Sequence, residues 1–255
     1  MRTVAMTGSA SGIGAATRAR LERDGVRVIG CDLRGADVIA DLSTRHGRAQ
    51  ATAGLREAAR GRLDGVVLCA GLGPQAPVAS IAAVNYFGAV EVLAGLRETL
   101  AGGSEPAAVV ISSNSATISR GLDAALVDAF LGGDEAAAVA RAASFEGAAV
   151  YAASKLALAR HIRREAVSAA WAGSGIRLNA VAPGAVQTPL LQGGLDDAKL
   201  GSAIRMLPIP LGGFGKPENI AAAVAFLLGP DAAFCCGTIL FADGGSDALI
   251  RPDAP

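Results

Sequence analysis

The sequence predicts an α/β fold, in which helices cover both faces of a doubly wound parallel sheet. Short runs rich in Val, Ile and Ala alternate with longer Ala-, Leu- and Arg-rich stretches from residue 3 onwards. This alternation is typical of parallel strands that are joined by crossover helices. A glycine-rich turn, Thr7–Gly14, directly follows the first predicted strand. No Pro- or Ser-rich linker divides the chain, so we expect a single domain over residues 1–255.

The first half of the chain alternates strands and helices in a regular order. Its predicted strands are runs of three to seven residues rich in Val, Ile, Ala or Cys, namely Thr3–Thr7, Val26–Asp32, a short Val38–Ala40, and Asp64–Cys69. The helix-forming stretches that follow them predict helices over Ile13–Asp24, His46–Ala59 and Val84–Ala101. Asp24-Gly25 supplies a helix stop signal.

The second half continues the pattern with three more strands and two helices. The predicted strands are Ala108–Ser112, Ile176–Ala182 and Thr238–Phe241, and the predicted helices are Tyr151–Ala172 and Pro217–Leu228. Gly173 and Gly175 end the first of these helices.

Two long segments have no place in the predicted sheet. Asn114–Val150 is an Ala-rich, partly acidic insertion, and Pro183–Gly215 is rich in Gly, Pro and Leu. Each begins at the carboxyl end of a strand, where open parallel sheets bind ligands. Long segments without a sheet role in a compact domain are often lids. We therefore predict that 114–150 and 183–215 cover a substrate.

Composition argues against several classes of partner. Basic and acidic residues balance at 23 each, so no basic field attracts nucleic acid. Apolar stretches such as Ala221–Leu228 are far too short to span a bilayer. The first residues form a strand rather than a signal sequence. We expect a cytoplasmic protein with no nucleic-acid or membrane partner.

The cysteines and histidines do not predict a metal site. The four cysteines lack C-x-x-C spacing, and Cys235-Cys236 could only close a strained ring, so free thiols are expected. No ligand cluster surrounds His46 or His161. Both histidines are predicted at solvated helix positions.

Tyr151 and Lys155 form the most informative pair of the sequence. The chain has only two tyrosines and three lysines, yet one of each stands four residues apart. On a helix this spacing places both side chains on one face. A phenol has a pKa near 10, and a neighbouring ammonium group lowers it. The pair therefore predicts a proton donor and acceptor for a hydroxyl or carbonyl group.

The turn after the first strand predicts a dinucleotide site. Glycines in Thr7–Gly14 let the backbone turn sharply and approach a pyrophosphate, which then rests on the helix N-terminus. Asp32 closes the second strand and is placed to accept the hydroxyls of an adenosine ribose. Its carboxylate would repel a 2′-phosphate, which favours NAD over NADP. Arg34 lies close by and could soften that repulsion.

These motifs together resemble the short-chain dehydrogenase/reductase family in its single-domain, Rossmann-like form, over nearly the whole chain. The resemblance implies a catalytic set of Ser113, Tyr151, Lys155 and Asn85, with Asn85 holding a water for proton relay. Ser112 is the alternative to Ser113, which we prefer because the family's serine is the second of such a pair. The implied cofactor-binding residues, in addition to Tyr151 and Lys155, are Gly8, Ser11, Gly12, Ile13, Gly14, Asp32, Asp41, Leu42, Cys69, Ala70, Gly71, Pro183, Gly184, Val186 and Thr188.

Individual positions of this pattern carry specific expectations. Asp41-Leu42 resembles the adenine contact of the family, and Val186 and Thr188 resemble the residues that hold the nicotinamide carboxamide. Cys69 departs from the family, which usually has asparagine there. The resemblance implies that Lys155 lowers the pKa of Tyr151, while hydride passes between the carbinol carbon and NAD.

Within the family, the chain resembles the subgroup of bacterial 3α-hydroxysteroid dehydrogenase/carbonyl reductases. The similarity lies in Ala36–Ser43, Val67–Gln75, Asn85–Gly88 and Thr188–Gln192, and in the long insertion before the tyrosine. It implies NAD-dependent interconversion of a small hydrophobic alcohol and ketone. The insertion would obstruct the usual dimer face, so the implied homodimer or homotetramer uses another surface.

The substrate is expected to contact Ser113 and Tyr151 and an apolar wall. Candidates for the wall are Leu190, Leu191 and Met206, with Leu195, Leu207 and Leu211. They offer no charged anchor, which suits a steroid better than a sugar or keto acid, although packing under a lid explains them equally well. Alternatives are a terpene alcohol, a 3-oxoacyl thioester, a polyol, or a protein that senses NAD without turnover. An enoyl reductase fits less well, because that branch spaces its Tyr and Lys further apart.

Overall fold

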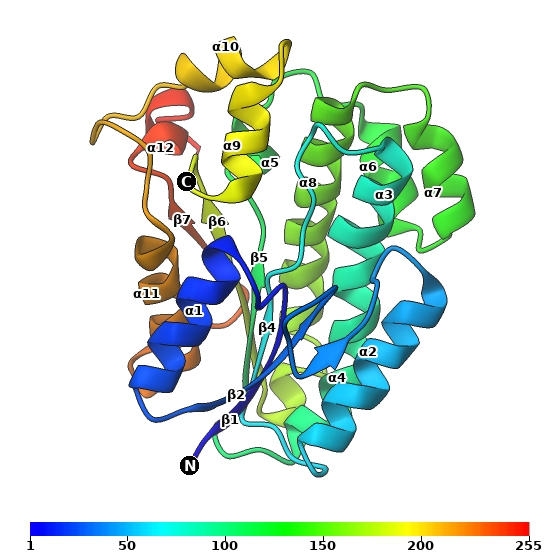
Figure 1. The fold of residues 1–255 in the computed structure, drawn as a ribbon, viewed down its shortest axis with the longest axis vertical. Helices are drawn as coiled ribbons and strands as arrows, with labels where there is room; N and C mark the ends of the chain where they lie inside the picture. The colour runs from blue at the N-terminus through cyan, green and yellow to red at the C-terminus, as the bar shows by residue number, and fades with distance from the viewer. Residues whose placement is uncertain (255) are drawn as a thin grey trace.

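The computed structural model describes residues 1–254, which form one parallel sheet of seven strands with helices on both faces (Figure 1). The strands lie in the order β3-β2-β1-β4-β5-β6-β7, and every neighbouring pair is parallel. Their bounds are β1 Thr3–Thr7, β2 Arg27–Asp32, β3 Val38–Ile39, β4 Gly65–Leu68, β5 Ala107–Ile111, β6 Arg177–Pro183 and β7 Ile239–Ala242. The predicted fold class is confirmed.

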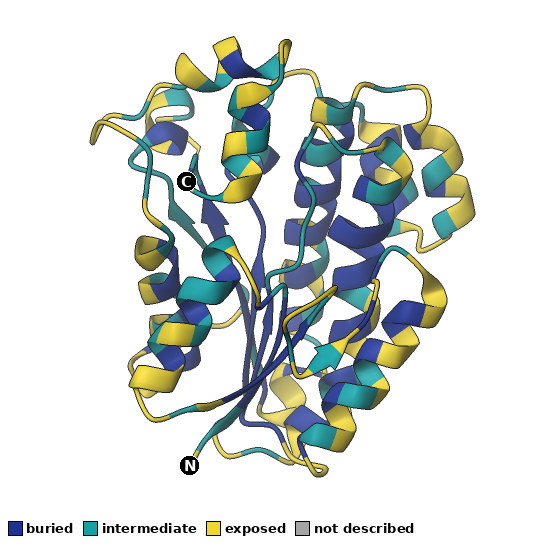
Figure 2. Ribbon diagram, viewed as in Figure 1, coloured by how far each residue is buried: buried dark blue, intermediate teal, exposed yellow. Residues whose placement is uncertain are grey.

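Two layers of helices bury the sheet. Helices α1 (Gly12–Arg23) and α11 (Pro217–Leu228) cover one face, and α2 (Arg45–Ala58), α4 (Ala89–Ala101) and α8 (Gly147–Ala166) cover the other (Figure 1). The central strands β4 and β5 are buried along their whole length, as Figure 2 shows. Burial from both sides explains why these strands read as continuous apolar runs rather than alternating ones.

A single long helical run crosses the face of the sheet before β5. It comprises α3 (Val78–Ala82), a π-helical segment η1 (Ala83–Gly88) and α4. The predicted start at Val84 is therefore six residues late, because the helix begins directly after Pro77, whose fixed φ suits a helix start. By length and composition alone, Val78–Ala101 could also cross a membrane, so the expectation that no stretch is long enough was wrong. Core helices pass the same test, and 56% of its most apolar window is buried in the fold.

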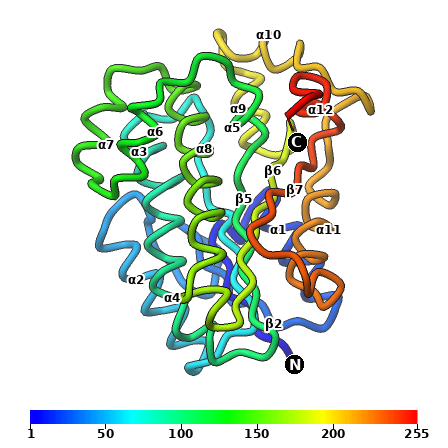
Figure 3. Tube along the Cα trace, turned by 180° about the vertical axis from the view of Figure 1, so that it is seen from behind, coloured from blue at the N-terminus to red at the C-terminus, as the bar shows by residue number. Residues whose placement is uncertain are grey.

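The insertion folds into three short helices, of which only the first reaches the edge where the strands end. These are α5 (Ser115–Ile118), α6 (Ala124–Leu131) and α7 (Glu135–Ala142). Helix α6 packs on α8, and α7 packs on α3, at the outer side of the helical layer (Figures 1 and 3). Val127 and Phe130 are buried there. Residues 124–142 thus thicken the core, which differs from the expected lid.

Helix α8 is displaced from its predicted bounds. It starts at Gly147, one turn before Tyr151, and ends at Ala166 rather than Ala172. The chain then turns through η2 (Ala172–Ser174), and Trp171 is buried. His161 is half-buried with its ring centroid 6.1 Å from that of Tyr86, so its predicted solvated position was wrong. Burial lowers the pKa of His161.

Four further short elements follow β6. They are α9 (Pro189–Asp196), α10 (Leu200–Arg205), η3 (Pro230–Ala232) and α12 (Ser246–Ile250), which the sequence analysis did not predict as helices. Helices α9, α10 and α12 lie near the end of the molecule where the strands have their carboxyl ends (Figure 1). The Thr188 hydroxyl caps α9 by accepting a hydrogen bond from the Leu191 N–H at 3.2 Å.

Candidate active site

A cleft of about 770 Å³ lies at the carboxyl ends of the strands. Strand β1 lies between β2 and β4 in the sheet, so the connections that lead to these two strands run to opposite sides of β1. This is the topological switch point at which open parallel sheets bind ligands. All of the predicted cofactor-binding residues line it, as do Ser113, Leu190 and Leu191. Of the predicted site residues, four do not line the cleft: Asn85, Leu195, Met206 and Leu211.

One end of the cleft fits the phosphates of a dinucleotide. Helix α1 begins there at Gly12 with no acidic residue in its first turn, and its N-cap, Ser11, makes no side-chain hydrogen bond to it. The first N–H groups of a helix lack intrahelical acceptors and carry partial positive charge. An uncapped helix start that faces a cleft is therefore suited to an anion.

Glycine is required at two positions of this turn by close backbone approach. Gly8 has a φ of +67°, and a Cβ atom there would lie 2.5 Å from the Ala70 nitrogen. A Cβ atom at Gly14 would lie 1.8 Å from the Gly8 carbonyl oxygen. The first contact lets the chain after β1 pack against the chain after β4, and the second lets the start of α1 pack on the turn that follows β1.

Asp32 is fixed at the adenosine end of the cleft. Its carboxylate accepts hydrogen bonds from the Ala10 N–H at 2.9 Å and the Leu33 N–H at 2.7 Å. Two backbone donors thus orient an acceptor beside the helix start, where a ribose would follow the pyrophosphate. A carboxylate held in this way can accept the ribose hydroxyls of NAD.

Ser112 and Ser113 differ in what their hydroxyls contact. The Ser112 hydroxyl donates to the Lys155 carbonyl oxygen at 3.1 Å and so belongs to the packing of β5 on α8. The Ser113 hydroxyl accepts a hydrogen bond from the Ser115 N–H at 3.1 Å, and it is close enough to Tyr151 to lower the pKa of the phenol. This arrangement supports the preference for Ser113.

Lys155 is buried below the tyrosine, with 4% of its surface exposed. Its ammonium group donates to the Ile111 carbonyl oxygen at 2.9 Å and lies 6.0 Å from the Tyr151 ring centroid. Burial lowers the pKa of Lys155 to about 8, although the nearby Cys69 opposes the shift. The group is therefore still mostly protonated at pH 7.

The pKa of Tyr151 is raised rather than lowered in this structure. Burial raises it, and the hydrogen bond with Ser113 only partly offsets that rise. The Lys155 ammonium group is bonded to the Ile111 carbonyl oxygen, and burial dominates the shift. The expected lowering of the Tyr151 pKa by Lys155 is thus not met in the protein without a ligand.

Asn85 lies behind the cleft in the π-helical segment η1. Its amide accepts a hydrogen bond from the Leu72 N–H at 2.7 Å and donates to the Leu72 carbonyl oxygen at 3.0 Å. A Cβ atom on Gly71 would lie 3.4 Å from Asn85 Oδ1 and 3.6 Å from Lys155 Nζ. Asn85 and Lys155 therefore flank the same short stretch of backbone at Gly71.

The other end of the cleft is apolar and receives residues from four separate segments. Leu207 of the predicted wall is present, whereas Leu195 and Leu211 do not line the cleft. Met206 ends α10 and has 75% of its surface exposed, so its predicted place in the wall was wrong. Sequence reasoning missed further apolar residues there, among them Ile118 of α5, Leu200 and Ile204 of α10, and Ile250 of α12. Their positions in short, weakly patterned helices gave no signal.

Cys69 occupies the place where an asparagine was expected. Burial raises the pKa of its thiol to about 12, although Lys155 opposes the rise. All four cysteines are free. Within residues 1–254, no three His, Cys, Asp or Glu side chains gather closely enough to hold a metal ion.

Comparison with known proteins agrees with this geometry. A family model described as Enoyl-(Acyl carrier protein) reductase matches residues 136–247. The chain is 44% identical to a 3-alpha-hydroxysteroid dehydrogenase/carbonyl reductase of Comamonas testosteroni, with 99% of each chain covered. It is 35% identical to a cis-4-hydroxycyclohexanecarboxylate dehydrogenase of Sinomonas cyclohexanicum, with 97% of each covered.

A solved structure is similar over the same length. The 3-alpha-hydroxysteroid dehydrogenase from Pseudomonas sp. B-0831, crystallised with NADH, matches with a TM-score of 0.95 and 47% identity. The match covers 99% of this chain and 100% of that one. Sequence, fold and cleft geometry lead to one assignment. The chain belongs to the short-chain dehydrogenase/reductase family.

Proposed function

We propose that this protein is an NAD(H)-dependent oxidoreductase that interconverts a hydrophobic secondary alcohol and its ketone, with 3α-hydroxysteroids as the substrate class. The observation that carries the proposal is the position of Tyr151 and Ser113. Both line the one cleft that also contains the N-terminus of α1 and the apolar residues of α5, α9, α10 and α12. The two relatives of highest identity quoted above are both named as 3-alpha-hydroxysteroid dehydrogenases, and one was solved with NADH.

Each polar residue has a proposed role in the reaction. Tyr151 takes the hydroxyl proton of the alcohol, or returns it to the ketone. Ser113, which lies beside Tyr151, holds the substrate oxygen and stabilises the charge that develops on it. NAD, when bound, supplies the acceptor of the hydride. Lys155 keeps a positive charge beneath the phenol, and Asn85 holds a water that connects the lysine to solvent.

The cofactor-binding residues follow the order of the dinucleotide along the cleft. The N-terminus of α1 binds the pyrophosphate, and Asp32 accepts the ribose hydroxyls. Because that carboxylate is held by two backbone N–H groups, it stays in place to repel a 2′-phosphate. NAD is therefore the preferred cofactor.

The substrate wall is proposed to include Leu190 and Leu191 from the predicted set. Leu207, Ile118 and Ile250 extend it, in place of Met206. We keep the lid interpretation for the part of 183–215 that lines the cleft and for 114–119, but not for 124–142.

Absorbance at 340 nm tests the proposal directly. The protein is mixed with NAD and either 3α-hydroxysteroids, cyclic alcohols, terpene alcohols or polyols, and with NADH and ketosteroids or 3-oxoacyl thioesters in the reverse direction. We expect NADH formation with the hydroxysteroid, and a loss of at least about 10²-fold in kcat for Tyr151→Phe, because a positioned acid/base contributes 10²–10⁴ in rate. A Tyr151→Phe variant with near-normal turnover would overturn the assignment.

A non-catalytic NAD sensor is the alternative from a different class. It predicts tight NADH binding without turnover of any alcohol or ketone in the panel. The presence of Ser113, Tyr151, Lys155 and Asn85 together favours the enzyme. The four-residue spacing of Tyr151 and Lys155 also favours a carbonyl reductase over the enoyl reductase named by the matching family model.

We further propose a homodimer or homotetramer in the cytoplasm. Helices α6 and α7 cover the outer side of α8 and α3, so contacts between copies must use another surface. Phe226 and Phe234 are exposed near the edge strand β7, which is itself only half-buried. Sedimentation of the wild type and of Phe226→Glu would show whether this edge joins two copies. The free thiols suit a reducing compartment.

A further inference from the structure

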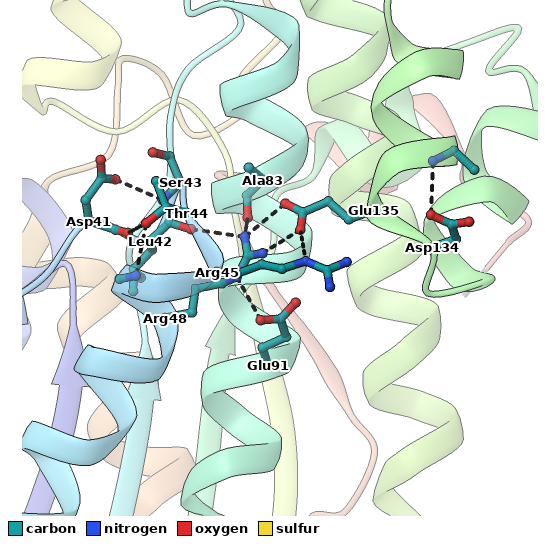
Figure 4. Close-up of polar contacts among 12 residues, drawn as sticks. Asp41, Leu42, Ser43, Thr44, Arg45, Arg48, Ala83, Glu91, Asp134 and Glu135 are labelled. Atoms are coloured by element: carbon teal, nitrogen blue, oxygen red, sulfur yellow. Dashed lines mark hydrogen bonds and ion pairs between the residues drawn. The ribbon is translucent and has the colours of Figure 1, made fainter.

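Arg48 is a buried arginine outside the cleft that the proposed mechanism does not use. It lies on α2 with 1% of its surface exposed. Burying a guanidinium group is costly unless its donors are satisfied, so such a residue needs specific partners. Figure 4 shows that its partners come from four different segments of the chain.

Two carboxylates neutralise the Arg48 charge. The Glu135 carboxylate of α7 accepts hydrogen bonds from both terminal nitrogens of Arg48 in a bidentate pair. The distance from Arg48 Nη1 to Glu135 Oε1 is 3.0 Å. The Glu91 carboxylate of α4 accepts a hydrogen bond from Arg48 Nε at 2.8 Å. A bidentate pair fixes the plane of the guanidinium group as well as its position. The group is therefore held rigidly between the insertion and the helical layer.

The remaining contacts of Arg48 reach the back of the cofactor cleft. Nη1 donates to the Leu42 carbonyl oxygen at 3.3 Å and to the Ala83 carbonyl oxygen at 3.4 Å. Leu42 belongs to residues 40–43, which line the cleft and which we call the adenosine wall. Ala83 opens the π-helical segment η1. Arg48 thus links a loop that lines the cleft to a helix of the core.

The insertion supplies the residue that keeps Arg48 in place. Glu135 stands in the first turn of α7, where the helix dipole favours a carboxylate. The Asp134 side chain caps the same helix by accepting from the Ala137 N–H at 3.1 Å. An Asp123–Arg141 ion pair at 3.0 Å ties α6 to α7. Glu135 is therefore itself well anchored, although residues 124–142 do not reach the cleft.

We propose that Arg48 is a positioning residue for the adenosine half of the cofactor, and that Glu135 of the insertion holds it in place. The insertion does not line the cofactor site itself. Its Glu135 holds Arg48, and Arg48 holds the adenosine wall in position through the Leu42 carbonyl oxygen, so the insertion affects the affinity for the cofactor. This inference rests on the proposed function, because it takes NAD(H) as the ligand of the cleft.

Fragment binding to whole, folded protein tests the inference. NADH binding is measured by fluorescence titration, and ADP-ribose and nicotinamide mononucleotide are measured by competition with NADH. For Arg48→Met and Glu135→Gln we expect the Kd of NADH and of ADP-ribose to rise by about tenfold, the scale of a lost hydrogen bond to a charged group. The Kd of nicotinamide mononucleotide should not change. Arg48→Lys, which keeps the charge but not the bidentate geometry, should fall between these variants and the wild type.

Arg45→Gln is the matched control. Arg45 also pairs with Glu135, at 3.3 Å, but its side chain is 75% exposed and no hydrogen bond joins it to either carbonyl. It should bind NADH and ADP-ribose like the wild type. If Arg48→Met does not fold, Glu135→Gln alone decides the question, because it leaves the arginine in place.

Three outcomes would overturn the inference. Unchanged ADP-ribose affinity in folded Arg48→Met and Glu135→Gln, with only a lower melting temperature, would make the network purely structural. Equal weakening of both fragments would mean general loosening of the cleft. A wild-type protein that binds no NADH at all would overturn the proposed function and this inference with it, whereas the first two outcomes leave the proposed function intact.

Discussion

Replacing Lys155 by methionine should stabilise the protein in the absence of cofactor while it removes activity. The ammonium group is buried with 4% exposure, and its pKa falls from 10.5 to about 8. A pKa that is lower in the folded state than in the unfolded state means that the charged form opposes folding. The penalty is complete below pH 8 and disappears as the pH rises towards 10.5.

The structure gives the size of the effect. A shift of about 2.5 units at about 1.36 kcal/mol per unit is a penalty of about 3.4 kcal/mol at pH 7. The hydrogen bond from Lys155 to the Ile111 carbonyl oxygen, at 2.9 Å, offsets about 1.5–3 kcal/mol of it. Methionine has a similar length and no charge. We therefore expect Lys155→Met to raise the free energy of unfolding by about 1 kcal/mol at pH 7, or roughly 2–4 °C in Tm.

The assay is denaturant unfolding of cofactor-free wild type and Lys155→Met between pH 7 and pH 9. Over this range the free energy of unfolding of the wild type should rise by about 1.3 kcal/mol, because Lys155 loses its proton in the folded state. The difference in unfolding free energy between the two proteins should therefore shrink as the pH rises. Taking the difference cancels groups that do not interact with Lys155, such as Cys31, whose raised pKa contributes stability that is lost above pH 9. A difference that stays constant with pH, or a variant well below the wild type at pH 7, would refute the reasoning.

Three further predictions concern the cofactor, the substrate and the thiols. Asp32→Asn removes the charge that faces a 2′-phosphate, so the ratio of kcat/KM for NADP to that for NAD should rise at least about tenfold in steady-state assays; an unchanged ratio would show that Asp32 does not select the cofactor. Asp247→Asn breaks the ion pair with Arg251 at 2.9 Å, which lies within α12 and its C-cap, and weakens the contact with Thr117, which holds α12 against α5. The steroid KM should rise several-fold at constant NADH Kd, and equal shifts in both would contradict a role confined to the substrate end. Burial raises the pKa of the half-exposed Cys69 to about 12, so at pH 8 a disulfide reagent should label the exposed Cys236 and spare Cys69 until guanidinium unfolds the chain; rapid labelling of Cys69 in the folded protein would mean that its pKa is not raised.

The sheet could be predicted from the sequence because burial on both faces leaves a strong local signal. All seven strands are present close to their expected places, including the two-residue β3. Asp64 is the informative exception, since the predicted strand began there. Its carboxylate instead accepts hydrogen bonds from the N–H groups of Thr3 and Ser104, at 2.9 and 2.8 Å. Asp64 therefore joins residues at the amino ends of the strands, opposite the cleft.

The helices of the insertion could not be predicted with the same certainty. An Ala-rich, partly acidic segment gives little periodicity, and its packing depends on Val127 and Phe130 finding a surface formed by α8. The π-helical segment η1 also has no local sequence signal, and its Asn85 makes two hydrogen bonds to the backbone of Leu72, outside the helical run. Both features depend on tertiary contacts.

The polar part of the site could be predicted better than its apolar part. Tyr151, Lys155 and the glycine turn are set by spacing along one element, which a sequence displays directly. Ile250 reaches the cleft only because Asp247 docks α12 beside α5, a contact of residues 130 apart in the chain. The raised pKa of Tyr151 likewise depends on burial that no local pattern reveals.

The strand order has a consequence for how the binding site is assembled during synthesis. The segments that would hold adenosine and pyrophosphate, from β1 to Gly71, lie within the first third of the chain. Tyr151, Thr188 and Ile250 come much later and close the cleft from the other side. As the chain leaves the ribosome, the nucleotide half can pair its strands before the reactive half exists. A nascent chain could therefore meet its cofactor before it is able to use it.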